Sequence, residues 1–96
     1  MDHVEAQFEW DEEKATINAR KHGVTFAQAS EVFSDPLGIE FYDLNHSENE
    51  PRYARVGLSG KHLLMVVFTV RNQRTRIIQA RKASRLLETQ YVSENS

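Results

Sequence analysis

The sequence contains no cysteine, no long apolar run, no internal repeat and no low-complexity segment. Disulfide bonds and thiolate metal ligands are therefore excluded. No stretch approaches the ~20 apolar residues that span a bilayer, and residues 1–9 are acidic and lack a hydrophobic signal core. We therefore expect a cytoplasmic protein that does not associate with membranes. The 96 residues suffice for one core, so we expect a single domain over residues 1–96, with residues 1–7 and 92–96 flexible.

The net charge of −2 hides an uneven distribution of charge along the chain. The first fifty residues hold three Lys or Arg against twelve Asp or Glu, whereas the remainder hold nine against two. This segregation predicts a polarised surface with a basic side suited to phosphate. The alternative is that folding intermixes the two halves.

Two helices are predicted in the N-terminal third, after a short alternating stretch at residues 8–10 that could be a strand. Asp11 is a good N-cap for the first helix, which Gly23 ends because glycine readily adopts a left-handed conformation. Residues 25–28 fit a capping box that starts the second helix. Pro36 ends that helix because it disfavours helical geometry at the preceding residue.

The rest of the chain reads as strands followed by a helix. Residues 37–42 and 52–59 alternate between apolar and polar, as half-buried strands do, whereas residues 63–68 are apolar throughout and predict a strand covered on both faces. A basic strand and a closing helix at residues 83–91, with Leu86 and Leu87 packing inward, complete the pattern. We therefore predict an α+β fold, with two N-terminal helices packed on an antiparallel four-stranded meander and a C-terminal helix.

The basic strand lies within residues 71–85, which contain six cations and no acid. Strict alternation places Arg76 and Ile78 on one side of this strand and Ile77 and Arg81 on the other. Such charge can protect a sheet edge from aggregation. Phosphate recognition explains the missing acids better, because arginine offers a planar fork to phosphate oxygens. RNA fits this interpretation, since Tyr53 and Tyr91 could stack on unpaired bases.

Histidine is the side chain best suited to proton transfer near neutral pH. His46 lies in a polar loop with Glu48 and Arg52, a set that could supply a base, an orienting anion and a phosphate clamp, although an ordinary polar loop is the alternative. His22 precedes Gly23, where an imidazole can also simply complement the helix dipole. The two other histidines, His3 and His62, we expect to be solvated and incidental. No pair has metal-ligand spacing, so no metal site is expected.

Four segments together resemble the BrnT family, the ribonuclease toxins of bacterial type II toxin-antitoxin modules. These segments read FEWDEEK, NARKHGVTFAQASEVFSDP, HSENEPRY and RIIQARKAS, and the resemblance spans roughly residues 8–91. The family is similar to RelE-type toxins in fold, with helices packed against an antiparallel sheet and an RNA-facing surface on the sheet and the last helix.

The resemblance implies RNA cleavage that blocks translation without a cofactor or metal, and a hetero-oligomer with a BrnA-like antitoxin through which operator DNA is bound. The catalytic residues carried over by motif, or placed beside those motifs, are Lys21, His22, His46, Glu48, Arg76 and Arg81. The RNA-binding residues expected around them are Arg52, Arg71, Arg74, Lys82, Arg85 and Tyr91. The alternative is a non-catalytic RelE-like protein that only binds an antitoxin or nucleic acid.

Overall fold

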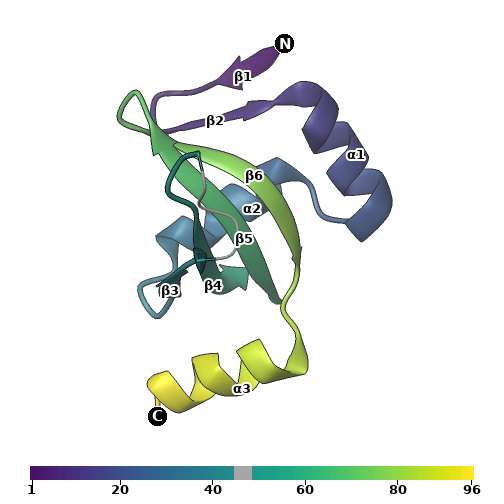
Figure 1. The fold of residues 1–96 in the computed structure, drawn as a ribbon. Coiled ribbons are helices and arrows are strands. Elements are labelled where there is room, and N and C mark those ends of the chain that lie inside the picture. The colour runs from purple at the N-terminus through teal and green to yellow at the C-terminus, as the bar shows by residue number, and fades with distance from the viewer. Residues whose placement is uncertain (45–48) are drawn as a thin grey trace.

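One mixed β-sheet organises the computed structural model, which describes residues 1–44 and 49–96. Its spatial order is β1-β2-β6-β5-β4-β3, and neighbours are antiparallel except for β2 and β6, which are parallel. The strands of the described chain are β1 (Asp2–Val4), β2 (Phe8–Asp11), β3 (Ile39–Tyr42), β4 (Tyr53–Ser59), β5 (His62–Arg71) and β6 (Arg74–Lys82). The fold is α+β, and β3 to β6 form the predicted meander (Figure 1).

The sheet is nevertheless larger than the four strands predicted. β2 and β1 extend it on the far side of β6, and β1 forms within the stretch that the sequence predicted as a flexible arm. β2 pairs with β6 through Phe8 and Glu9, opposite Thr75 and Arg76. The sequence pattern did not reveal this pairing because it joins segments more than sixty residues apart.

The first helix and the start of the second lie at the predicted signals, whereas the rest of the second helix and the last helix differ from the prediction. α1 (Glu12–His22) starts at Asp11, whose side chain accepts a hydrogen bond from the Lys14 amide at 3.0 Å, and ends at Gly23 with φ 69°. The predicted capping box starts α2 (Phe26–Ser30), but the predicted second helix tightens into a 3₁₀ turn, η1 (Glu31–Ser34). α3 (Arg85–Glu94) begins later than predicted, at the Ser84 cap, and runs into the segment predicted as a tail. No helix in the described residues is both long and apolar enough to cross a membrane.

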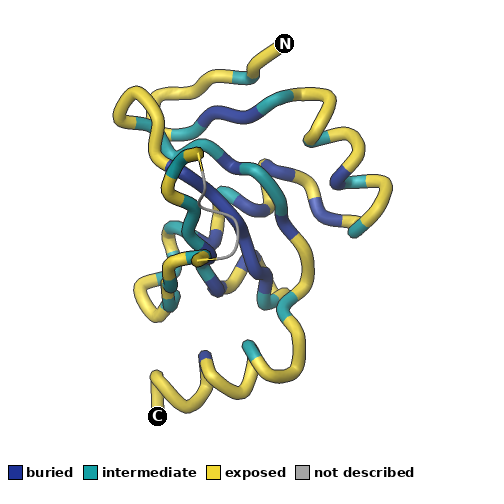
Figure 2. Tube along the Cα trace, in the orientation of Figure 1, coloured by how far each residue is buried: buried dark blue, intermediate teal, exposed yellow. Residues whose placement is uncertain are grey.

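The sheet separates two hydrophobic clusters. α1, α2 and η1 pack on one face, here termed the helix face, around core residues that include Phe26, Val66 and Ile77. α3 covers part of the opposite face, the α3 face, where Val67 and Tyr91 belong to the second cluster. β5 contributes to both clusters and is buried along most of its length (Figure 2). The prediction that residues 63–68 form a strand covered on both faces is confirmed.

A β-bulge interrupts the alternation of β6. Phe68 pairs with Ile77 and Val67 pairs with Gln79, so Ile78 is an extra residue without a direct partner in β5. As a result Ile77 and Ala80 both belong to the helix-face cluster, while Ile78 packs on the α3-face cluster.

The bulge corrects the predicted facing of the two central arginines. Arg76 lies opposite Thr69 and Arg81 opposite Met65. Thr69 and Met65 are four residues apart in β5 and therefore point to the same side, which is the α3 face. The prediction that Arg76 and Arg81 lie on opposite faces is wrong, because the extra residue reverses the alternation between them.

Candidate nucleic-acid interface

Four arginines gather where β5 and β6 meet in a hairpin. This hairpin cluster comprises Arg52, Arg71, Arg74 and Arg76. Arg76 donates two parallel hydrogen bonds to the Asp2 carboxylate, at 3.0 and 3.1 Å, and its Nη1 lies 3.5 Å from Oε1 of Glu9. The Arg76 side chain is 14% exposed and that of Glu9 only 6%. The chain's own acids therefore already hold this guanidinium.

The neighbouring arginines of the hairpin cluster are also engaged. Arg71 donates to Glu50 at 2.9 Å, and Arg74 Nε donates to the backbone carbonyl of Glu5 at 2.8 Å. The hydrogen bond from Arg71 lowers the pKa of Glu50, with smaller contributions from the charges of Arg71, Arg52 and Arg76. Bonding to Asp2 likewise raises the pKa of Arg76 and lowers that of Asp2. Each partner thus stabilises the charged form of the other.

The polar connector between β3 and β4 begins and ends beside this cluster. The Asp43 amide donates to the Arg52 carbonyl at 2.8 Å, and the buried Thr69 hydroxyl donates to the Pro51 carbonyl at 2.6 Å. The Arg71–Glu50 pair adds a second attachment of the connector to β5. His46 and Glu48, predicted as catalytic residues of this connector, lie outside the described residues.

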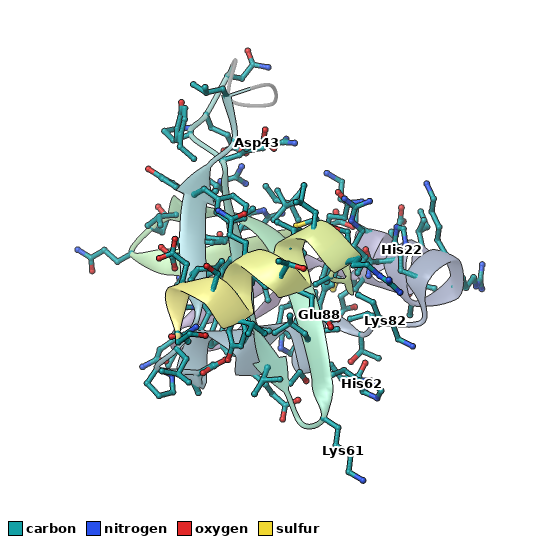
Figure 3. The ribbon with its side chains drawn as sticks, turned by 90° about the horizontal axis from the view of Figure 1, so that it is seen from below. His22, Asp43, Lys61, His62, Lys82 and Glu88 are labelled. Carbon is teal, nitrogen blue, oxygen red and sulfur yellow. The ribbon has the colours of Figure 1, made fainter. Side chains whose placement is uncertain are left out.

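A second set of cations lies at the other end of β6. This far-end cluster comprises Lys21, His22, Arg81, Lys82 and Arg85. The side chains of these residues make no ion pair or hydrogen bond with the part of the chain that the structure describes. Seen from below, His22 and Lys82 lie on the same side of the molecule, whereas Asp43 lies beyond α3 (Figure 3). The far-end cluster therefore presents basic side chains that no acid of residues 1–44 and 49–96 neutralises.

Asn18 attaches the end of α1 to β6. Its side-chain amide donates to the carbonyls of Ala80 and Val24 at 2.8 and 2.9 Å, and its carbonyl accepts from the Ala80 amide at 3.1 Å. β2 pairs with β6 only at Thr75 and Arg76, so farther along this edge Asn18 takes the place of a neighbouring strand. His22 follows one turn later on the same side of α1. This bridge brings the Lys-His pair of α1 to the end of β6 that carries Arg81.

A shallow groove of about 280 Å³ lies along this junction. Its lining joins apolar, cationic and amide groups from α1 and β6, namely Lys14, Ile17, Asn18, Lys21, His22, Ile78 and Gln79. The bulge contributes directly, because Ile78 is the extra residue and Gln79 follows it. Within residues 1–44 and 49–96, no three His, Asp or Glu side chains come together as metal ligands.

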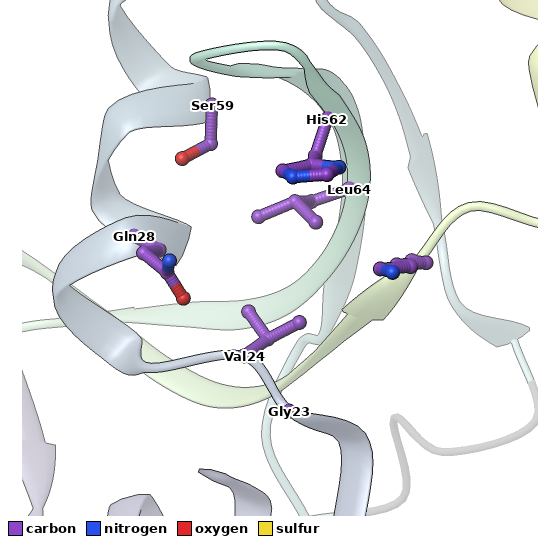
Figure 4. Close-up of a pocket in the computed structure, with 7 residues that line it drawn as sticks. Gly23, Val24, Gln28, Ser59, His62 and Leu64 are labelled. Carbon is purple, nitrogen blue, oxygen red and sulfur yellow. The ribbon is translucent and has the colours of Figure 1, made fainter.

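Lys82 faces away from Arg81, because adjacent residues of a strand alternate. It lines a pocket of about 130 Å³ on the helix face together with Gly23, Val24, Gln28, Ser59, His62 and Leu64 (Figure 4). His62, interpreted from sequence as incidental, thus shares a cavity with one of the predicted RNA-binding residues.

Tyr91 is buried and anchors α3 to the rest of the protein. It is 9% exposed, and its hydroxyl donates to Asp35 at 2.7 Å, which raises the pKa of the tyrosine. Asp35 also accepts from the amides of Leu37 and Leu58, both at 2.9 Å, so it ties α3 to the β3 and β4 region. With this burial, the Tyr91 side chain offers little surface on which a base could stack. Leu86, predicted to pack inward, is 76% exposed, because only Leu87 of this pair reaches the core.

Sequence reasoning missed Asp2 and Glu9 as partners of Arg76. The alternation of residues 8–10 did indicate that Glu9 points away from its apolar neighbours Phe8 and Trp10. Its burial could not be inferred, because it depends on the parallel pairing of β2 with β6.

The two arginine-bearing clusters lie on one strand but at separate places. Arg76 and Arg81 lie opposite Thr69 and Met65, which are four residues apart in β5, and at about 3.3 Å per residue this is ~13 Å along the sheet. A single phosphate group therefore cannot lie beside the strand at both Arg76 and Arg81. The fold and these surfaces define a small α+β protein with a cationic sheet face suited to a phosphate backbone.

Comparison of the sequence with models of protein families identifies the family to which the chain belongs. The family model described as "Ribonuclease toxin, BrnT, of type II toxin-antitoxin system" matches residues 10–86. The chain therefore belongs to the BrnT family, and membership implies a ribonuclease toxin with an antitoxin partner. A search of curated proteins found no match.

Proposed function

We propose that this protein cleaves RNA by metal-independent acid–base chemistry, inhibits translation, and is neutralised by a BrnA-like antitoxin that binds operator DNA. The observation that carries the proposal is the bulge in β6, which puts Arg76 and Arg81 on one face of the sheet. A single RNA strand running along β6 would meet the two arginines at different phosphates.

The reaction requires a base, an acid and cations. A base removes the proton of a ribose 2′-hydroxyl, whose oxygen attacks the adjacent phosphorus, and an acid protonates the leaving 5′-oxygen. His46 or Glu48 is the proposed base, and His22 or Lys21 the proposed acid. Arg76, Arg81 and Arg52 form the proposed clamp. Arg81, at the end of β6 near His22, stabilises charge on the phosphorane, and Arg76 and Arg52 hold phosphates farther along the strand.

The remaining predicted RNA-binding residues fall into three positions. Arg71 and Arg74 extend the arginine track to the tip of the hairpin, and Arg85 extends it toward α3. Lys82 contacts only an RNA that bends around the end of β6, because this residue lies on the helix face. Tyr91 supports the interface by anchoring α3 rather than by touching RNA.

The proposal is tested with purified protein and bare RNA, with and without EDTA. We expect cleavage to survive EDTA; its complete loss would instead require a metal. Single substitutions His22→Ala, His46→Ala and Arg81→Ala should each reduce cleavage at least about a hundredfold, the lower range for removing one participating group. Arg20→Ala is the matched control, because Arg20 is an exposed cation on the same helix beside Lys21. Full activity of a variant removes that residue from the mechanism.

A second candidate function is a non-catalytic partner that binds only antitoxin or nucleic acid. It is favoured by the hairpin cluster, where acids of the chain already occupy Arg71 and Arg76. Expression without an antitoxin separates the two functions. Growth arrest that a co-expressed antitoxin relieves supports the ribonuclease, whereas harmless expression of folded protein supports the binding partner.

A further inference from the structure

We infer that the Asp2 carboxylate occupies the position on Arg76 that an RNA phosphate takes in the complex, and that Glu9 is the positioning residue that keeps Arg76 there. The inference rests on the proposed function and adds to it a defined phosphate subsite with an internal competitor. Neither acid was among the residues that the sequence motifs indicated.

The geometry of the Asp2 contact is that of a bound anion. Asp2 Oδ1 and Oδ2 accept from Nη2 and Nη1 of Arg76 at 3.0 and 3.1 Å, so both nitrogens at the tip of the fork are used. Arginine presents the same planar fork to carboxylate and phosphate oxygens. The Asp2 side chain is 46% exposed and comes from a three-residue edge strand, so it can turn into solvent when another anion arrives.

Glu9 differs from Asp2 because its buried side chain cannot move away from Arg76 into solvent. Its side chain is 6% exposed, it lies directly opposite Arg76 in the parallel β2–β6 pair, and its Oε1 is 3.5 Å from Nη1. This oxygen is buried without a hydrogen-bond partner among the described residues. A buried carboxylate needs a nearby cation. Glu9 therefore retains the Arg76 guanidinium on the α3 face whether or not Asp2 is bound.

Exchange at this subsite preserves the local balance of charge. The Asp2 carboxylate and an RNA phosphodiester each carry one negative charge, so replacing one by the other leaves Arg76 and Glu9 in the same electrostatic setting. Arg71 lies close enough to contribute to the lowered pKa of Asp2 and would face the incoming strand as well.

β1 stays attached without the Asp2 carboxylate. His3 stacks on Trp10 with ring centroids 4.3 Å apart, and the Met1 carbonyl accepts from the Glu12 amide at 3.0 Å. The three residue pairs of β1 with β2 are formed by backbone groups. Asp2→Asn therefore removes the competing charge and keeps the strand.

The test measures binding of a single-stranded 2′-O-methyl RNA oligonucleotide, which lacks the nucleophile, by fluorescence anisotropy at low and moderate salt. Glu5→Gln is the matched control, because it removes the same charge close by from a side chain that contacts His3 and no arginine. If Asp2 holds Arg76 about 90% of the time, removing it raises the apparent affinity about tenfold. We expect this gain for Asp2→Asn, and less than about twofold for Glu5→Gln at moderate salt, where distant charges are screened.

Glu9→Gln should change affinity in the opposite direction. It leaves Arg76 without its fixed partner, so RNA binding weakens by about threefold or more, while Asp2→Asn strengthens binding. Circular dichroism shows whether Glu9→Gln folds. If it does not fold, the comparison of RNA affinity between Asp2→Asn and Glu5→Gln tests the inference. Equal affinities for Asp2→Asn and Glu5→Gln, or weaker binding by Asp2→Asn, overturn the inference.

Cleavage of unmodified RNA separates this inference from the proposed function. If the wild type cleaves RNA but Asp2→Asn binds as Glu5→Gln does, the ribonuclease proposal stands and the inference fails. If no variant cleaves but Asp2→Asn still binds more tightly, the subsite stands and the ribonuclease proposal fails. Absence of binding by every variant overturns the subsite.

Discussion

The hairpin cluster and the far-end cluster lie on the same strand but carry different charge environments. At the hairpin, Arg71 and Arg76 contact acids from the first half of the chain, whereas at the far end Arg81 and Lys82 have no acid partner among the described residues. Folding thus intermixes the two halves of the sequence at one end and leaves them segregated at the other. A count of cations therefore overstates the charge that is available to RNA.

The largest expected contrast is in stability. Arg76→Ala leaves Glu9 buried without its cation and should lower the free energy of unfolding by about 3 kcal/mol. Arg81→Ala removes an exposed side chain that has no ion-pair partner in the described part of the chain, and it should change the free energy of unfolding by less than about 0.5 kcal/mol. Urea unfolding measures the change in the free energy of unfolding for both variants. The double variant Glu9→Gln with Arg76→Ala should recover part of the loss, and equal stabilities of the two single variants would contradict the comparison.

The attachment of α1 should show the next largest effect. Asn18→Ala leaves the Ala80 amide and two buried carbonyls without partners, so unfolding should become easier by about 2–3 kcal/mol. Thr16→Ala, on the exposed side of the same helix, serves as the control. RNA cleavage by folded Asn18→Ala should also fall, because His22 is no longer held beside β6. Unchanged cleavage would show that the Asn18 bridge does not position the far-end cluster.

Salt dependence of RNA binding should distinguish paired from unpaired arginines. Loss of one phosphate contact to a single strand reduces the slope of log affinity against log salt by about 0.7. We expect this reduction for Arg81→Ala. Arg71→Ala should reduce the slope less, because Glu50 already neutralises Arg71 in the free protein. Equal slopes for the two variants would show that the hairpin pairs are fully displaced on binding.

The smallest expected effect is on acid stability. The pKa of Glu50 lies below its ordinary value of 4.5 in the folded protein, chiefly because of the hydrogen bond from Arg71. The stabilisation from this pair is therefore complete above pH 4.5 and is lost as the pH falls through the folded pKa. Between pH 5 and pH 3, Glu50→Gln should lose less stability than the wild type in thermal unfolding. Glu88→Gln, on α3, should follow the wild type, and a parallel loss in both variants would argue against the pair.

Predictions from sequence succeeded where the signal was local. The Asp11 cap, the Gly23 stop and the capping box at residues 25–28 each depend on a few neighbouring residues, and the structure has all three. Tyr91 shows the limit of such reasoning. A tyrosine near the end of an amphipathic helix can face solvent or core, and its hydrogen bond to Asp35, 56 residues earlier, decides for the core.

The sequence by itself determined both ends of α1, the start of α2, the doubly covered strand and the family, because caps, periodicity and motifs are encoded in short stretches. Only the tertiary structure decided which cations are neutralised and which face they occupy. The parallel pairing of β2 with β6 puts Glu9 beneath Arg76, and one bulged residue turns Arg76 and Arg81 to the same side. Both outcomes depend on register between distant strands, and a shift of one residue reverses the facing of every side chain beyond it.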